Sequence, residues 1–251
     1  MGWKPEGEVR FALCTDLDGT FLGGSDEGKA QLYGAWRRPR AQELLIFVTG
    51  RDLDFVEHLC RHEGVPAPDF VIGDVGTSVV AWPGREPIAE VEEWIDACWQ
   101  SPEARIRALL EEEPGLRLQD VQGGRRVSYL YDPEVLRPEA ASKAREAGFD
   151  VTLSADIFFD VLPKGVAKGS SLKRLLATLE IPEDACVVSG DTLNDLSLFE
   201  TGIAGIAVGN AEPKLVERIQ GWSHVYHAQA PGTEGIIEGL SRLGHWPLPS
   251  L

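Results

Sequence analysis

The stretch from Val9 to Leu22 reads VRFALCTDLDGTFL, and the fold can be worked out from it. An apolar run typical of a buried strand ends in two aspartates, Asp16 and Asp18, followed by Gly19 and a threonine. Buried carboxylates are costly unless something compensates their charge. Their position directly after a strand indicates a ligand site, because open α/β sheets bind ligands at the carboxyl ends of their strands.

The same arrangement recurs further along the chain. The apolar run 44–49 stops at Gly50-Arg51, and the run 185–189 is followed by GDTLND at 190–195. Helical patterns lie between these strands, one of them beginning near Lys168, while 41–45 is interpreted as the end of a helix. Strands that alternate with helices predict an α/β fold, with a Rossmann-like core of parallel strands and helices on both faces.

The sequence changes character after the Pro-Gly pair at 83–84. The middle block has a charged amphipathic stretch over 90–113, a strictly alternating strand at 126–132, and two short strands around Asp156. We therefore predict a core made of residues 1–83 and 160–251. A smaller inserted α/β cap domain is predicted over residues 84–159.

Net charge and composition exclude several functions. The chain has 251 residues and a net charge of −16, which repels nucleic acid. It contains no apolar run of 18 residues, and its four cysteines are widely spaced, so we expect a cytoplasmic protein without a membrane partner. An anionic substrate would need a metal ion and a few local cations to reverse the field within one pocket.

In a parallel sheet, the three strand ends meet at one edge. This brings several carboxylates together with Thr49, Lys168 and Asn194, and such crowding is costly unless a divalent cation neutralises it. Hard oxygen ligands favour Mg²⁺. A zinc site at His58 and His62 lacks a supporting signature. Asp191 and Asp195 could instead cap the helix near Leu193.

Four motifs in this order resemble those of haloacid dehalogenase superfamily phosphatases: DLDGT at 16–20, TGR at 49–51, Lys168-Gly169 and GDTLND at 190–195. The insertion between the second and third motifs resembles the subclass with an α/β cap at that place. Within it, the chain is most similar to the sucrose-phosphate phosphatase family, through PDFVIGDVGTSV, RRVSYLYD, FFDVLPKGVAKGSSLKRLL and VSGDTLNDLSLFE.

The resemblance implies a role for each motif residue. Asp16 would be the nucleophile, and Asp18 the general acid and base, with a pKa raised by burial and acidic neighbours. Mg²⁺ would be held by Asp16, the backbone carbonyl of Asp18 and Asp191, with Asn194 and Asp195 close by. The phosphoryl group would be bound by Thr49, Gly50, Arg51, Lys168 and Asn194. An indirect role at a helix end is the alternative for Arg51, and Lys164 is the alternative to Lys168.

Specificity is expected to come from the cap. Gln122, Arg125, Arg126 and Ser128 lie on or near one predicted cap strand and could bind sugar hydroxyls; a solvated cap surface is the alternative. The substrate implied is a small sugar phosphate. Gly123-Gly124 replaces bulkier residues expected in the sucrose-phosphate branch, so sucrose-6-phosphate, mannosylfructose-phosphate and glucosylglycerol-phosphate all stay open.

Two rival functions remain. A phosphosugar mutase would need a second, strongly basic phosphate site in the cap. An inactive sugar-phosphate-binding protein would need no catalytic residues, yet every motif position is filled. The sequence leaves the oligomeric state open.

Overall fold

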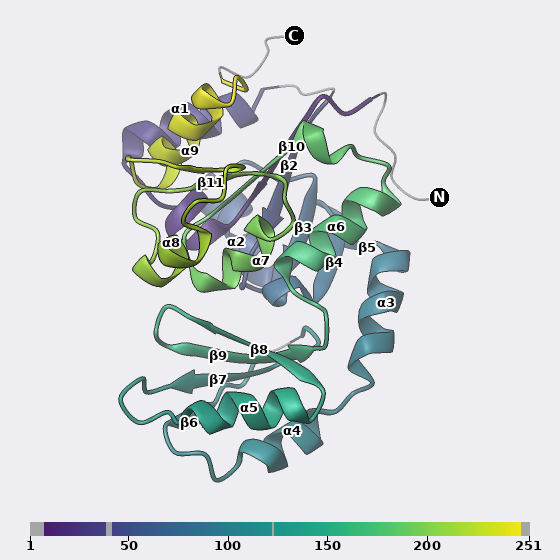
Figure 1. The fold of residues 1–251 in the computed structure, drawn as a ribbon. Coiled ribbons are helices and arrows are strands. Elements are labelled where there is room, and N and C mark those ends of the chain that lie inside the picture. The colour runs from purple at the N-terminus through teal and green to yellow at the C-terminus, as the bar shows by residue number, and fades with distance from the viewer. Residues whose placement is uncertain (1–7, 39–41, 122, 247–251) are drawn as a thin grey trace.

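The computed structural model describes residues 8–38, 42–121 and 123–246, and Figure 1 shows its ribbon. The strands of the larger sheet are β1 (Phe11–Thr15), β2 (Glu43–Val48), β3 (Phe70–Gly73), β4 (Ser78–Ala81), β5 (Glu86–Pro87), β10 (Cys186–Gly190), β11 (Ala204–Ala207) and β12 (Val225–His227). Those of the smaller sheet are β6 (Leu116–Leu118), β7 (Val127–Tyr131), β8 (Phe149–Ser154) and β9 (Phe158–Pro163).

The larger sheet has the order β12-β11-β10-β1-β2-β3-β4-β5. Neighbours from β12 through β3 run parallel, whereas β4 and β5 are added antiparallel at one edge. The predicted α/β fold with a mainly parallel sheet is confirmed. The predicted helix end at 41–45 is wrong over 43–45, because β2 already begins at Glu43, and residue 41 lies outside the described residues. A short apolar run does not distinguish strand from helix.

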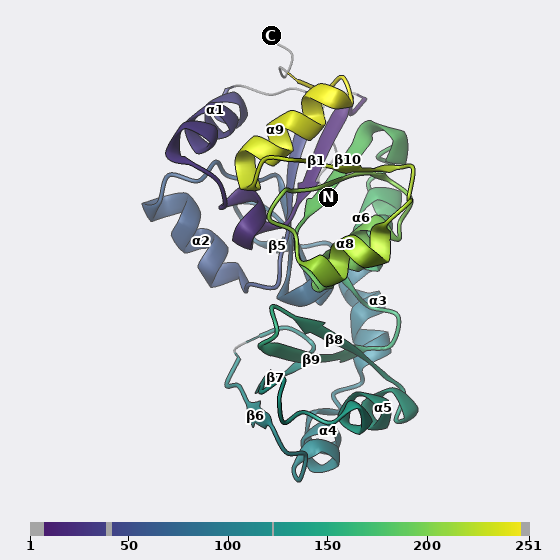
Figure 2. The same cartoon turned by 60° about the vertical axis from the view of Figure 1, so that its left-hand side comes forward.

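Helices cover both faces of the larger sheet (Figure 2). The helices of the described chain, including α4 and α5 on the smaller sheet, are α1 (Asp26–Trp36), α2 (Leu53–His62), α3 (Ala89–Trp99), α4 (Glu103–Leu110), α5 (Pro138–Glu146), α6 (Lys168–Thr178), α7 (Leu196–Phe199), α8 (Pro213–Ile219) and α9 (Gly232–Arg242). Alternate strand residues point to opposite faces. Ala12 and Cys14 therefore join a core with α3, α6, α7 and α8, while Phe11 and Leu13 join one with α1, α2 and α9.

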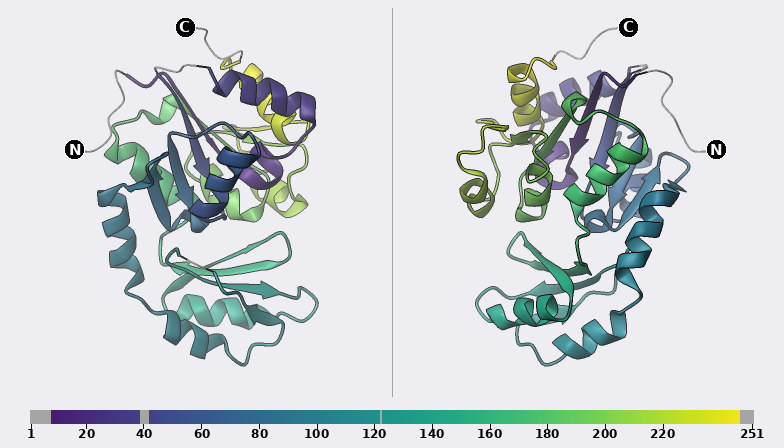
Figure 3. Two further views of the ribbon diagram at one scale, coloured as in Figure 1. Left: turned by 180° about the vertical axis from the view of Figure 1, so that it is seen from behind. Right: turned by 45° about the vertical axis from the view of Figure 1, so that its right-hand side comes forward.

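The smaller sheet is antiparallel, in the order β6-β7-β9-β8. Helices α4 and α5 pack on one face, and the other face is turned toward the larger sheet (Figures 1 and 3). The larger sheet continues to Pro87 and the smaller one to Pro163, so the division between sheets falls a few residues beyond the predicted 83/84 and 159/160 boundaries. We call the unit around the smaller sheet the cap.

Helix α3 connects the two units. Its first turns place Val91 and Ile95 in the core beside α6, and its last residue, Trp99, packs in the hydrophobic core of the cap. Within the described part of the chain, none of the helices has the length and apolar character needed to cross a membrane.

Candidate active site

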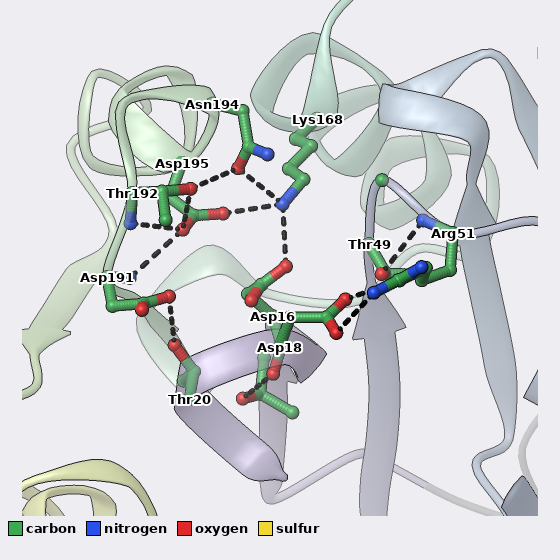
Figure 4. Close-up of polar contacts among 12 residues, drawn as sticks. Asp16, Asp18, Thr20, Thr49, Arg51, Lys168, Asp191, Thr192, Asn194 and Asp195 are labelled. Atoms are coloured by element: carbon green, nitrogen blue, oxygen red, sulfur yellow. Dashed lines mark hydrogen bonds and ion pairs between the residues drawn. The ribbon is translucent and has the colours of Figure 1, made fainter. Parts of the chain in front are cut away.

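The carboxyl ends of β1 and β10 bring two acidic segments together. Thr15 pairs with Ser189, and the Asp16 N–H donates to the Ser189 carbonyl at 3.0 Å. Carboxylate oxygens of Asp16, Asp191 and Asp195 lie within 4.8 Å of one another (Figure 4). Segments about 175 residues apart in sequence therefore share one point, as expected for neighbouring parallel strands.

Gly19 permits this close approach. Its φ of +77° lies in the left-handed region, and a Cβ at this position would lie 2.1 Å from Oδ2 of Asp191. No side chain longer than hydrogen fits there without displacing the carboxylate. The glycine of the first motif therefore allows the first and fourth motifs to meet.

Lys168, the first residue of α6, lies in the middle of the acidic cluster. The side chain is 0% exposed, and its Nζ donates to Asp16, Asn194 and Asp195, each at 2.7 Å (Figure 4). Burial alone would lower the pKa of Lys168, but Asp16 and Asp195 outweigh it and raise the pKa. The ammonium group therefore stays charged. Lys164 is exposed and lies outside this cluster.

The carboxylates at this point resist ionisation. Burial, followed by the charge of Asp195, raises the pKa of Asp16 well above its usual range. The same two causes raise the pKa of Asp191 to about 7. Such shifts mark a site whose negative charge lacks compensation within the chain.

Carboxylate oxygens suit a divalent cation, and Asp16, Asp191 and Asp195 are the residues that could hold one. Asp195 is the most deeply buried of the three, at 0% exposed; Oδ1 accepts from Lys168, and Oδ2 accepts from the backbone N–H groups of Asp191 and Thr192. Asn194 likewise uses its Oδ1 to accept from Lys168. Asp195 thus caps its own turn, as the capping alternative predicted, and it also holds Lys168.

Two residues orient Asp191, and neither was predicted to contact it. The hydroxyl of Thr20 donates to Oδ1 at 2.9 Å, and Nδ2 of Asn210 lies 3.3 Å from Oδ2. Asn210 also donates to the Gly19 carbonyl and accepts from the Gly232 N–H. Asn210 follows β11 by three residues, so the rule that strand ends carry the site could have identified it.

The side chain of Asp18 is not buried, although the sequence analysis expected it to be. Its side chain is 49% exposed, and both carboxylate oxygens accept from Arg51, at 2.8 and 2.9 Å. The guanidinium of Arg51 lies 4.5 Å from the centre of the Phe55 ring. The turn at Gly19 directs Asp18 away from the acidic cluster, and the ion pair with Arg51 holds it there (Figure 4).

The second motif forms the adjacent loop. Thr49 is fully buried, and its Oγ1 accepts from the Arg51 N–H at 3.1 Å. The carbonyl of Gly50 accepts from Nη1 of Arg126, a cap residue, at 3.1 Å. The predicted phosphate loop is thus in direct contact with the cap.

A cavity of about 270 Å³ lies between the core and the cap. Its core side is lined by Asp18, Gly50, Arg51, Asp52, Val75 and Asn194, and its cap side by Gln119, Val121, Arg126, Ser128, Ser154, Phe158 and Asp160. The carboxyl ends of the parallel strands open into this space, which is the place expected for a substrate.

The four predicted sugar-binding residues are placed differently from one another. Ser128 lines the cavity, and its hydroxyl donates to Asp160, whose pKa is raised by burial. Arg126 also lines it, but its guanidinium is directed to the core. Arg125 does not line it, because its side chain bonds to Glu92, Asp96 and the Thr77 carbonyl. Gln122 lies outside the described residues.

Arg126 joins the cap to a buried turn of the core. It is 9% exposed, and Nη2 donates to Asp74 at 2.9 Å. Burial raises the pKa of Asp74 to about 6, with Arg126 opposing the shift. Gly124 lies against the same turn: a Cβ there would lie 2.8 Å from the Cβ of Asp74. The glycine pair at 123–124, noted in the sequence, includes a residue needed for this contact.

These features define the class of protein. A mostly parallel sheet with carboxylates at its strand ends, covered by an inserted antiparallel unit, is the architecture of haloacid dehalogenase-type phosphatases. The chain belongs to the sucrose-6F-phosphate phosphohydrolase family, whose model matches residues 9–246. It is a sugar phosphatase, and therefore a phosphoric monoester hydrolase.

Two phosphatases and one synthase are among the similar proteins. The chain is 33% identical to mannosylfructose-phosphate phosphatase of Agrobacterium fabrum, covering 94% of this chain and 96% of the relative. It is 40% identical to glucosylglycerol-phosphate synthase of Pseudomonas anguilliseptica; 92% of this chain is covered, but only 30% of that longer protein. The sucrose-phosphatase of Synechocystis, solved with sucrose and phosphate, superposes with a TM-score of 0.85 at 25% identity, covering 94% of this chain and 98% of that one.

Proposed function

We propose that the chain hydrolyses a sugar phosphate with Mg²⁺ as its metal and an aspartyl-phosphate as intermediate. The substrate would be sucrose-6-phosphate or a related glycoside phosphate. The observation that carries the proposal is the meeting of Asp16, Asp191 and Lys168 at one point, where Lys168 donates to Asn194, a residue that lines the cavity between the core and the cap.

In the first step, Asp16 attacks phosphorus. Lys168 holds Oδ1 of Asp16, so Oδ2 is the attacking oxygen. The bond between phosphorus and the sugar oxygen breaks, and Asp18 gives the leaving oxygen a proton. Asp18 then takes a proton from water, which attacks phosphorus and releases phosphate and Asp16. For both transfers, Asp18 must exchange its contacts with Arg51 for those with the reactants.

Asp16, Asp191 and the backbone carbonyl of Asp18 would hold Mg²⁺. When bound, the ion supplies the positive charge that lets an anionic phosphate approach a carboxylate. Thr49, the Gly50 N–H and Lys168 would bind the phosphoryl oxygens, and the charge of Lys168 would stabilise the transition state.

The cap side of the cavity supports a sugar as the leaving group. Ser128, Ser154 and Asp160 offer hydrogen-bonding groups beside the ring of Phe158. A mutase would require a free cation for a second phosphate. Among the described cap residues that line the cavity, the cation is Arg126, which is already paired with Asp74.

A phosphate-release assay tests the proposal. The purified chain is incubated with sucrose-6-phosphate, mannosylfructose-phosphate and glucosylglycerol-phosphate, each with Mg²⁺ and with EDTA. We expect the wild type to hydrolyse at least one of these esters in Mg²⁺ and none of them in EDTA. The Asp16→Asn variant should hydrolyse none of them in either condition. Equal turnover in EDTA would contradict the metal assignment, and turnover by Asp16→Asn would contradict the nucleophile.

A further inference from the structure

One carboxylate connects the cap to the loop that carries Asp191. Glu212, the residue before α8, accepts from the Ala155 N–H through Oε1 at 2.8 Å. Through Oε2 it accepts from the Leu193 N–H at 2.9 Å. Ala155 belongs to the turn between β8 and β9 in the cap, and Leu193 to the 191–195 loop of the core. The two N–H groups lie on different units, and Glu212 is their shared acceptor.

Glu212 also contacts Asp191 directly through the main chain. Its own N–H donates to the Asp191 carbonyl at 2.7 Å. The 191–195 loop is thus held by Glu212 at two places, one on each side of Thr192. Strand β8 packs against the same loop, so the cap hairpin and the loop form a continuous contact.

The cap turn is shaped to reach this acceptor. Ala155 and Asp156 have φ values of +53° and +50°, a region that residues other than glycine occupy only when their surroundings hold them there. Asp156 forms an ion pair with Lys214 and accepts from the hydroxyl of Tyr131. The hairpin lies next to α7 and α8 in the ribbon, below them in Figure 1. The turn therefore docks on residues 212–214.

We propose that Glu212 is a positioning residue that makes the arrangement of the 191–195 loop depend on closure of the cap. The proposal rests on the function proposed above. When the cap leaves the core, Glu212 loses the Ala155 N–H and can turn to water, which weakens its hold on Leu193. A substrate that closes the cap stabilises the loop, because a ligand shifts an equilibrium by its differential interaction with the two states.

The chain offers a matched pair of variants. Glu212→Gln keeps the size of the side chain but replaces one acceptor oxygen by a donor, so one of the two N–H groups loses its partner. Lys214→Ala removes an ion pair to the same cap turn from the same segment, and that ion pair does not involve the 191–195 loop. Both side chains lie outside the acidic cluster.

Amide hydrogen exchange is the first readout, and it does not depend on activity. In Glu212→Gln, we expect exchange to speed up about fivefold in both the 154–158 and 191–195 segments, the equilibrium factor of one typical hydrogen bond. In Lys214→Ala, we expect faster exchange in 154–158 alone. Unchanged exchange over 191–195 in Glu212→Gln overturns the proposal.

Turnover is the second readout. With a sugar phosphate that the wild type hydrolyses, kcat of Glu212→Gln should fall about fivefold, again the factor of one hydrogen bond, whereas Lys214→Ala should stay within about twofold. With p-nitrophenyl phosphate, which offers the cap no sugar to close upon, Glu212→Gln should fall less than twofold. An equal loss on both substrates would mean that Glu212 holds the loop regardless of the cap. A wild type inactive on every ester would count against the proposed function, and the exchange experiment would still decide this inference.

Discussion

Asp191 should make the metal-free protein less stable as the pH rises. Its pKa is raised to about 7 in the folded chain, against an ordinary value of 3.8 that applies when the chain is unfolded. Between these values, the folded protein keeps a proton that the unfolded chain has lost. The free energy of unfolding therefore falls with pH, at about 1.4 kcal/mol per unit. From pH 5 to pH 7, the loss from this group is roughly 2 kcal/mol.

The test compares thermal unfolding of the wild type and Asp191→Asn in EDTA. For a chain of this size, roughly 2 kcal/mol corresponds to a change in Tm of about 4–8 °C. Between pH 5 and pH 7, the Tm of the wild type should therefore fall by about 4–8 °C more than the Tm of the variant. Titrating groups away from the cluster, including Asp74, contribute to both proteins and cancel in the difference. The pKa of Asp16 is raised in part by the charge of Asp191, so the measured difference reports on the pair. Parallel curves for the two proteins would refute the reasoning.

Mg²⁺ supplies an internal control. An ion held by ionised Asp16 and Asp191 competes with protons, so its stabilisation should be greater at pH 8 than at pH 5.5. In Asp191→Asn this pH-dependent gain should be largely lost. A Mg²⁺ effect of the same size in both proteins would place the ion elsewhere.

Three further outcomes are expected. Asp16→Asn should abolish turnover while its circular dichroism spectrum stays that of the wild type, because the amide oxygen can still accept from Lys168. Asn210→Ala should weaken Mg²⁺ binding, measured by calorimetry, about tenfold, because it removes an orienting contact to Asp191. Ser128→Ala should raise KM for the sugar phosphate several-fold and leave KM for p-nitrophenyl phosphate unchanged, since Ser128 lies on the cap side of the cavity.

The core of the site could be predicted because one physical rule covers it. Parallel strands end at the same edge, so Asp16, Thr49 and Asp191 had to converge once the strands were identified. The same rule applied to β3 and β11 would have singled out Asp74 and Asn210, which follow these strands directly or within three residues.

The cap contacts could not be derived in this way. Arg126 has the residue type of a sugar ligand, but its guanidinium bonds to Asp74 and the Gly50 carbonyl. These partners are more than 50 residues away in the sequence, so the residues around Arg126 do not predict them. Glu212 and Ala155 are 57 residues apart and belong to different units. The exposure of Asp18 was also missed, because it depends on the direction of one side chain after a glycine turn.

Charge explains why a strongly acidic chain can still accept a phosphate ester. Among the residues labelled in Figure 4, four are carboxylates and two are cations, and each cation is already bonded to a carboxylate. Asp16 must be ionised to attack, and with all four carboxylates ionised a phosphate entering without a metal would meet a net negative charge in a region of low dielectric, where repulsion is strong. A divalent ion brings the formal charge of these groups to zero, while the net charge of −16 is spread over the whole chain. The proposed metal therefore does more than orient the substrate: with Lys168 and Arg51 already paired, it is the charge that makes binding of the anion favourable.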